Sequence, residues 1–333
     1  MSNLQSQFKH VAVIGAGRMG KAIAIAFAYA GLNVKLIDAK ERQQADFFKY
    51  KLQLEQDILQ ELQVLTKIQF IQNDQVRLIQ NNIQILAKLD SLEYLGQCDL
   101  IMEAVPEQED VKQAIFSWLD QYISSQCIVA STTSTFLVSE IAKMLSNPER
   151  VINAHWLNPA YLIPLVELSR SEQTSQEVID HLKAFLSDMG KVPVVCNAKA
   201  GYIVPRIQAL AMNEAARMVE EGVASAEDID TAIRTGFGLR FSILGLLEFI
   251  DWGGGDILYY ASQYLEKELG QRYSTPQIVI ENMHNQRNGI REGQGFYNYD
   301  AMDIEAYKLK VLGTFAQRIE GAALTPKFNI LEN

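Results

Sequence analysis

The chain has 333 residues, which is enough for two domains of ordinary size. Hydrophobic residues make up 48% of the chain and charged residues 21%, the balance of a globular protein with apolar side chains for two cores. The formal net charge of −10 argues against broad binding to nucleic acid or to a membrane surface, because such binding calls for a positive protein surface. No apolar run approaches the roughly 18 residues of a transmembrane helix, so none is expected.

The first residues and the cysteines bear on location. Residues 1–10, MSNLQSQFKH, lack the apolar core of a signal peptide, and strand-like sequence follows almost at once. Cys98, Cys127 and Cys196 lie far apart in apolar runs, without the CxxC spacing of a metal or redox site. We therefore expect buried free thiols, no metal and a cytoplasmic protein.

Short apolar runs alternate with helical patterns over the first part of the chain, as in an α/β fold with a mostly parallel sheet. Met19–Ala30 is rich in Ala and Ile and predicts a helix packed on that sheet. The polar stretch from Lys40 to roughly Leu65 predicts a helix or helical pair projecting from it. The expected strands are His10–Ile14, Val34–Ile37, Ile83–Leu86, Leu100–Met102, Ile128–Ala130, Val151–His155, Leu165–Leu168 and Val192–Val195.

A glycine motif connects the first predicted strand to the first predicted helix: Gly15, Ala16, Gly17, Arg18, Met19 and Gly20. Gly15 would permit the tight turn, Gly17 would let the backbone approach a pyrophosphate, and Gly20 would let the helix pack close to the strand. The helix N-terminus would offer unpaired N–H groups to the phosphates. The motif predicts a Rossmann-type dinucleotide-binding domain over residues 1–197, with the helical insertion near residues 40–65.

Asp38 ends the next predicted strand, about 20 residues after the glycine motif. A carboxylate at this position accepts hydrogen bonds from both ribose hydroxyls and repels a 2′-phosphate, so it favours NAD over NADP. Arg42 nearby would soften that preference. We expect contacts on the nicotinamide side near Gly96 and at Ala104–Glu107.

After residue 197 the pattern changes to helices, which predicts an all-α second domain over residues 198–333. Ile207–Glu221 carries apolar residues at helical spacing, and Ser225 with the acidic residues after it predicts an N-cap. Ile243–Tyr264 is more apolar and aromatic than one small bundle would cover. Helices of this kind are often buried between subunits, so we expect a homodimer.

Among the four histidines, His155 has the position expected of a catalytic base. It ends a strand, whereas His10 precedes one and His181 and His284 lie in polar helical sequence. Glu167 lies in the apolar run PLVEL and needs a partner if it is buried. Two strands joined by a short loop would bring it to the imidazole and so prepare a base for a hydroxyl proton. A structural histidine is the alternative.

Several longer motifs together are more specific than any of these features alone. They are Val13–Gly20, Glu103–Glu107 with Lys112, Ala130–Ser134, His155–Pro159, Leu165–Glu167, Gly201–Val204, Glu227–Asp230 and Gly289–Tyr299. With them the sequence resembles the 3-hydroxyacyl-CoA dehydrogenase family, including bacterial 3-hydroxybutyryl-CoA dehydrogenases, over nearly its whole length. The resemblance implies that NAD oxidises a (3S)-3-hydroxyacyl-CoA, with a short acyl chain, to the 3-ketoacyl-CoA, as in fatty-acid β-oxidation.

The resemblance also implies roles for individual residues. His155 would be the general base, Glu167 its partner, and Ser134 would hydrogen-bond the substrate oxygen. Residues near the nicotinamide and its ribose would be Glu107, Lys112 and Asn158. Lysines of the helical insertion, around Lys49, Lys51 and Lys67, would face the CoA nucleotide.

Two departures leave the substrate class open. Pro205 replaces an Asn that contacts substrate in the family, so one contact is missing or replaced. The segment Gly236–Phe241, with Arg240, resembles the branch of lambda-crystallin, gulonate 3-dehydrogenase and carnitine dehydrogenase, which oxidise free hydroxy acids. Arg240 would then clamp a carboxylate, or else form a structural ion pair.

The segment Gly295–Tyr299, GFYNY, favours the acyl-CoA branch instead. A non-catalytic NAD-binding protein, as lambda-crystallin illustrates, is a third alternative. The intact glycine motif and the presence of Ser134, His155 and Glu167 speak against it.

Overall fold

The computed structural model describes residues 8–327. The chain forms two compact units, one ending at Ala211 and the other beginning at Met212. The division falls inside helix α9 (Val204–Glu220), which follows the last strand of the first unit. Among the described residues, no helix is long and apolar enough to cross a membrane.

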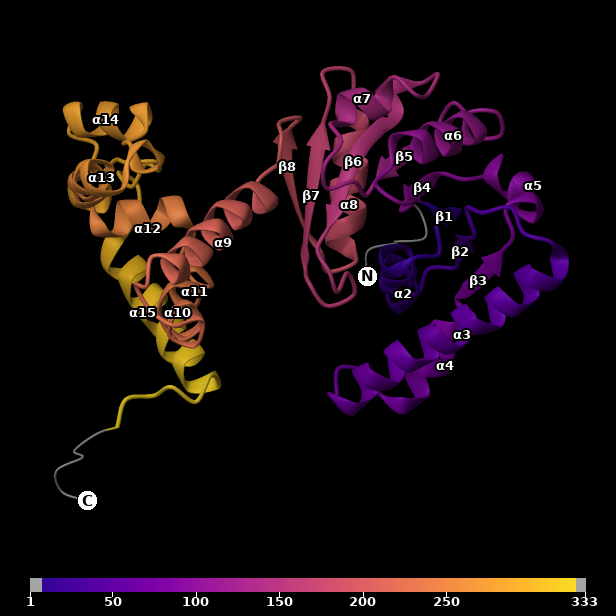
Figure 1. Cartoon of the computed structure of the whole chain (residues 1–333), viewed down its shortest axis with the longest axis horizontal. Coiled ribbons are helices and arrows are strands. Elements are labelled where there is room, and N and C mark those ends of the chain that lie inside the picture. Colours follow the sequence, from indigo (N-terminus) through magenta and orange to yellow (C-terminus); the bar gives the residue numbers. More distant parts are fainter. Residues whose placement is uncertain (1–7, 328–333) are drawn as a thin grey trace. The chain divides into compact units, whose positions relative to one another are not determined.

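The first unit is built on an eight-stranded sheet in the order β3-β2-β1-β4-β5-β6-β7-β8 (Figure 1). Neighbouring strands are parallel except for β6 and β7, which are antiparallel. The bounds are β1 Val11–Ile14, β2 Val34–Ile37, β3 Ile83–Leu86, β4 Leu100–Glu103, β5 Ile128–Ser131, β6 Val151–Trp156, β7 Leu165–Arg170 and β8 Val192–Asn197. All eight predicted strands are present, and the predicted α/β class with a mostly parallel sheet is confirmed.

Each face of the sheet has its own apolar core, because side chains alternate along a strand. From β1, Val11 and Val13 enter one core, whereas Ala12 and Ile14 enter the other. The first core also contains side chains of α2 (Arg18–Tyr29), α3 (Gln44–Lys67), α4 (Asn73–Asn81) and α8 (Gln176–Asp188). The second contains side chains of α5 (Leu92–Leu95), α6 (Glu109–Leu119) and α7 (Val138–Ala142).

The polar stretch after β2 forms the antiparallel helices α3 and α4, which extend away from the sheet in Figure 1. In α3, Leu54, Ile58, Leu62 and Leu65 are buried and recur at helical spacing. The exposed side of α3 carries the Gln, Glu and Lys residues of its sequence, together with the exposed apolar side chains of Phe48, Leu52 and Val64.

The second unit contains α10 (Ala226–Ala232), α11 (Gly238–Phe241), α12 (Leu246–Gly253), α13 (Gly255–Leu269), α14 (Gln277–His284) and α15 (Ile304–Gly321). Ser225 caps α10 by accepting from the backbone N–H of Asp228, as predicted. The apolar stretch 243–264 is not one helix: it is divided between α12 and α13 at Gly254, whose φ of 105° ends an α-helix.

The segment GFYNY has a structural task in this unit. The backbone N–H groups of Phe296 and Tyr297 and the hydroxyl of Tyr299 all donate to the buried carboxylate of Asp251, at 2.9–3.1 Å. A Cβ at Gly295 would lie 2.1 Å from an oxygen of that carboxylate, so only glycine fits there. The segment is therefore shaped by packing on α12.

Candidate active site

The predicted site residues of the first unit lie along one edge of the sheet, where β1, β2, β4, β5 and β6 end; this edge includes the reversal of strand order between β1 and β4. The carboxyl ends of parallel strands meet at one edge of a sheet, and ligands of such folds bind at this reversal. The turn formed by Gly15–Gly20, which we call the glycine turn, follows β1, and Ala104–Glu107 follows β4 at the same edge. Gly96 precedes β4 and lies at the opposite edge, so the expected nicotinamide contact near Gly96 is wrong.

The glycine turn has the shape that a dinucleotide pyrophosphate requires. Gly15 has a φ of 103°, and a Cβ there would lie 2.7 Å from the Ala104 carbonyl oxygen. A Cβ on Gly20 would lie 1.8 Å from the Gly15 carbonyl oxygen, so α2 packs against the turn as predicted. Gly17 has no atom within 4 Å of its Cβ position, and α2 has neither a side-chain cap nor an acidic residue in its first turn. Its first N–H groups, next to the exposed Arg18 and half-buried Met19, are thus available to an anion.

Asp38 lies at the end of β2 as expected, but it is already paired. Arg42 Nε donates to Asp38 Oδ2 at 2.5 Å, and the backbone N–H of Lys40 donates to Oδ1 at 3.2 Å. The Arg42 guanidinium also lies 4.0 Å from the ring centroid of Tyr50, whose hydroxyl donates to the carbonyl of Ala16 in the glycine turn. A ribose bound at Asp38 would therefore meet Arg42 as well.

We predict that Asp38→Ala raises the KM for NAD by roughly 10-fold to 100-fold, the effect of losing hydrogen bonds to a charged acceptor. The ratio of kcat/KM for NAD to that for NADP should also fall, because Arg42 loses its carboxylate partner and can then pair with the 2′-phosphate of NADP. Steady-state kinetics with both cofactors measure this. Asp180→Ala, an exposed carboxylate on α8, is the matched control and should change neither constant. Equal efficiency of the unmodified enzyme with NAD and NADP would contradict the assignment.

His155 and Glu167 are brought together by the antiparallel pairing of β6 with β7. They are direct partners in the register, and His155 Nδ1 lies 2.8 Å from Glu167 Oε2. Both residues are buried. An ionised carboxylate only accepts hydrogen bonds, so Nδ1 carries the proton and Nε2 keeps a lone pair. Nε2 is therefore the atom that can take a proton.

The other oxygen of Glu167 is held by the start of α9. Oε1 accepts from the backbone N–H groups of Ile203 at 3.0 Å and Val204 at 2.8 Å. Burial alone would raise the pKa of Glu167, but the hydrogen bonds from His155 and from these two amides outweigh it and hold the pKa below its usual value. Pro205 is the second residue of α9, where a missing N–H leaves no helical hydrogen bond unmade.

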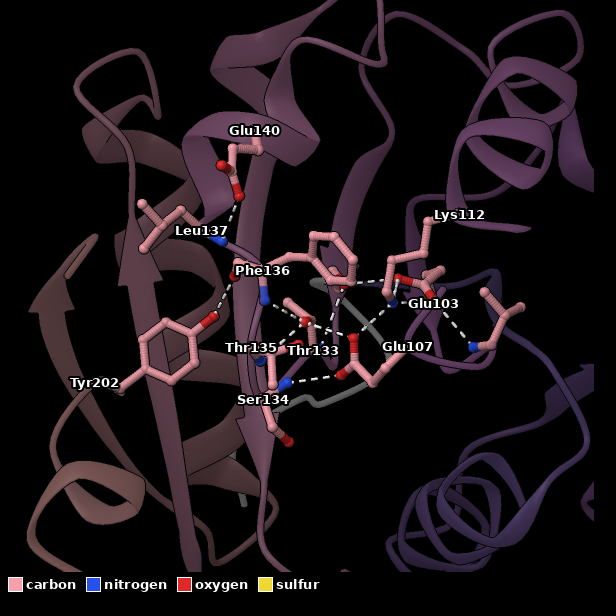
Figure 2. A network of polar contacts seen from close by, with 12 residues as sticks. Glu103, Glu107, Lys112, Thr133, Ser134, Thr135, Phe136, Leu137, Glu140 and Tyr202 are labelled. Atoms are coloured by element: carbon pink, nitrogen blue, oxygen red, sulfur yellow. Dashed lines mark hydrogen bonds and ion pairs between the residues drawn. The ribbon is translucent and has the colours of Figure 1, made fainter. Parts of the chain in front are cut away.

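A buried ion pair lies beside this site, in the network of Figure 2. Lys112 Nζ donates to both oxygens of Glu103, each at 3.0 Å, and the two side chains are 1% and 0% exposed. Glu103 also accepts from the hydroxyl of Ser131 at 2.6 Å and from the backbone N–H of Val105 at 2.8 Å. The predicted position of Lys112 beside a ribose would require its ammonium to leave this pair.

Glu107 connects the ion pair to the loop 132–137, which we call the Ser134 loop. Its carboxylate lies 3.7 Å from Lys112 Nζ and accepts from the Thr133 hydroxyl at 2.8 Å and the Ser134 backbone N–H at 2.7 Å. In Figure 2 the Ser134 hydroxyl points away from Glu107. Glu107 thus holds the loop and leaves that hydroxyl available to a substrate.

The predicted residues Asn158 and Arg240 belong to different units. Asn158 is exposed in the loop after β6, at the carboxyl edge of the sheet. Arg240, in α11 of the second unit, donates to the Gly236 carbonyl at 3.3 Å, and its guanidinium lies 5.3 Å from the Phe249 ring centroid. No ion pair joins Arg240 to another residue within 8–327, so the structural ion pair considered from the sequence is not found.

From the sequence alone, Ser131, Thr133, Tyr202 and Glu103 were assigned no role of their own. A usable signal existed for two of them: Glu103 and Ser131 are polar residues at the ends of otherwise apolar parallel strands, LIME and IVAS. No group of His, Cys, Asp and Glu among the described residues is arranged to hold a metal ion.

Comparisons with known proteins agree with this geometry. The NAD binding domain of 3-hydroxyacyl-CoA dehydrogenase matches residues 10–199, and the C-terminal domain of the same family matches residues 201–299. A solved 3-hydroxyacyl-CoA dehydrogenase of Archaeoglobus fulgidus superposes with a TM-score of 0.74 and 29% identity, over 95% of this chain and 99% of that one.

The names of similar proteins point to different activities. Mitochondrial hydroxyacyl-coenzyme A dehydrogenase of Mus musculus is 32% identical over 87% of this chain and 91% of its own. The 5-formyl-3-hydroxy-2-methylpyridine 4-carboxylate 5-dehydrogenase of Mesorhizobium japonicum is 28% identical over 90% and 93%. Lambda-crystallin of Oryctolagus cuniculus is 31% identical over 77% and 78%. The chain belongs to the 3-hydroxyacyl-CoA dehydrogenase family and is an NAD-dependent oxidoreductase with a Rossmann domain followed by a helical domain.

Proposed function

We propose that this enzyme oxidises the 3-hydroxyl of a short-chain (3S)-3-hydroxyacyl-CoA, such as 3-hydroxybutyryl-CoA, to the 3-ketoacyl-CoA. The observation that carries the proposal is the His155–Glu167 pair at the sheet edge that also holds the glycine turn. His155 Nε2 takes the proton of the 3-hydroxyl as the C3 hydrogen leaves as hydride. Bound NAD supplies the acceptor for that hydride.

The chain's own groups support this step electrostatically. Glu167 is ionised, because its pKa is held below the usual value, and it stabilises the imidazolium that forms on His155. The Ser134 hydroxyl donates to the substrate oxygen and orients it toward Nε2. Cofactor contacts fall to the glycine turn, Asp38 and Asn158, with Glu107 and Lys112 fixing the Ser134 loop beside them.

The thioester assignment is supported by the family match over both domains and by the similarity to mammalian hydroxyacyl-CoA dehydrogenase. Lys49 and Lys67 are exposed on α3, and a surface pocket of about 350 Å³ between α3 and α4 is lined in part by Lys67. These cations suit the phosphates of CoA. The segment GFYNY is weaker support for a CoA substrate than its sequence suggested. Its contacts to Asp251 give it a structural role that involves no substrate.

A free hydroxy acid is the second candidate substrate. Arg240 is without an acidic partner among the described residues, so its guanidinium is available for a bidentate contact to a carboxylate. The similarity to a pyridine carboxylate dehydrogenase and to lambda-crystallin supports this alternative. A purely structural role is disfavoured by the paired His155 and Glu167.

The test compares acetoacetyl-CoA with free 3-hydroxy acids such as carnitine and gulonate, by following NADH absorbance. We expect turnover of acetoacetyl-CoA and a KM at least about tenfold higher for its N-acetylcysteamine analogue, because the nucleotide handle then no longer contributes binding energy. Arg240→Met should change thioester kinetics by less than about threefold. Arg234→Met, which removes a neighbouring exposed arginine paired with Asp230, is the control.

The opposite result identifies the alternative. If acetoacetyl-CoA is inert, a free 3-hydroxy acid turns over, and Arg240→Met alone lowers that activity about 100-fold, then the thioester assignment is wrong.

We further propose that the enzyme is a cytoplasmic homodimer acting in fatty-acid metabolism. Large apolar side chains of the second unit are exposed on one chain, among them Tyr260 and Tyr264 on α13 and Leu309 and Leu312 on α15. Tyr260 and Tyr264 are four residues apart and Leu309 and Leu312 three, so each pair shares one face of its helix, and an exposed apolar helix face is typical of a subunit interface.

A further inference from the structure

Tyr202 lies between the Ser134 loop and His155, although its own chemistry is not used in the reaction. Its hydroxyl donates to the backbone carbonyl of Phe136 in the Ser134 loop at 2.6 Å (Figure 2). Its ring lies 5.8 Å, centroid to centroid, from the imidazole of His155. The next two residues along the chain, Ile203 and Val204, donate the amides that hold Glu167.

The backbone at this residue is also unusual. Tyr202 has a φ of 45°, in the left-handed region that costs energy for any residue with a Cβ. It follows Gly201, whose φ is 78°. Such conformations persist where the surrounding contacts determine them, and they are concentrated at functional sites. Here the two residues turn the chain so that α9 begins with its amides directed at Glu167.

The hydroxyl of Tyr202 is a dependable donor. The residue is buried, and burial together with the negative charge of Glu107 raises its pKa, so the phenol keeps its proton. The Ser134 loop is therefore held from two sides: Glu107 accepts from Thr133 and Ser134, and Tyr202 donates to Phe136.

We propose that Tyr202 is a positioning residue that sets the distance between the Ser134 hydroxyl and the imidazole of His155. Its hydrogen bond to Phe136 ties the Ser134 loop to the segment that holds Glu167. The positions of the Ser134 and His155 side chains are thereby both fixed relative to the Tyr202 ring. This inference rests on the proposed function of His155 and Ser134.

The test is Tyr202→Phe, which removes only the hydroxyl. We expect kcat with acetoacetyl-CoA to fall by about tenfold, because a small misplacement of a reacting group slows the chemical step. The KM for acetoacetyl-CoA and the Kd for NAD should stay within about twofold, since neither the nucleotide handle nor the glycine turn is touched. Tyr202→Leu, which also removes the ring from beside His155, should lower kcat further than Tyr202→Phe does.

Tyr94→Phe is the matched control. The Tyr94 hydroxyl also donates to a backbone carbonyl, that of Val11, but at the amino end of the sheet. The Tyr94→Phe variant should lower the thermal midpoint about as much as Tyr202→Phe does and leave kcat unchanged. The inference is overturned if Tyr202→Phe keeps the unmodified kcat, or if both variants lose activity in step with stability. If His155→Gln remains fully active, the proposed function itself falls, whatever Tyr202→Phe shows.

Discussion

His155→Gln is expected to lower kcat by about 10²-fold to 10⁴-fold, the range for removal of a positioned acid–base group. The Kd for NAD should change by less than about twofold, because His155 lies on β6 whereas the glycine turn follows β1. Glutamine has similar length but cannot take up the hydroxyl proton at the position of Nε2. Steady-state kinetics and cofactor titration by fluorescence measure the two effects separately.

Glu167→Gln should act in the same direction. The carboxylate accepts from His155 through one oxygen and from two backbone amides through the other. An amide has a single oxygen, so its NH2 group would face a donor on one of these sides. His181→Gln, an exposed histidine on α8, is the control and should leave kcat unchanged. A His155→Gln enzyme with near-normal turnover would show that the base lies elsewhere.

Lys112→Met is expected to lower the free energy of unfolding by about 3–5 kcal/mol, because it leaves the carboxylate of Glu103 buried without its cation. For a domain of this size the thermal midpoint should fall by roughly 10 °C. Ser131 and the Val105 amide would still donate to Glu103, but neither supplies a charge. Thermal unfolding followed by circular dichroism measures the change.

The double variant Glu103→Gln with Lys112→Met tests the pair as a unit. It should be more stable than Lys112→Met alone, since neither charge is then left unpaired. The control is Lys21→Met, which breaks a 2.6 Å pair with Asp57 whose partners are 14% and 29% exposed. Water reaches this partly exposed pair and screens it, so its loss should cost only about 1 kcal/mol, well below the loss expected for the fully buried pair. Losses that simply add in the double variant would rule out a coupled pair.

Most of the architecture of the first unit could be predicted from the sequence because it depends on local pattern. The run VAVI is apolar on both faces and fully buried, which only a strand covered by helices on both sides can satisfy. The glycine spacing likewise predicted the turn after β1, since Gly15 and Gly20 each lie where a Cβ would collide with backbone. In the second unit the pattern misled at Gly254: apolar character continues through it, but its φ of 105° ends the helix.

The sequence by itself determined the strands, the dinucleotide turn, and the two residues, His155 and Glu167, that form the central pair. Only the tertiary structure decided what surrounds them: Glu103 lies opposite Ser131, and Tyr202 lies between the Ser134 loop and His155. The physical reason is that hydrophobic periodicity specifies which side of an element is buried. The partner of a buried polar group depends instead on strand order and register, which bring together residues far apart in the chain.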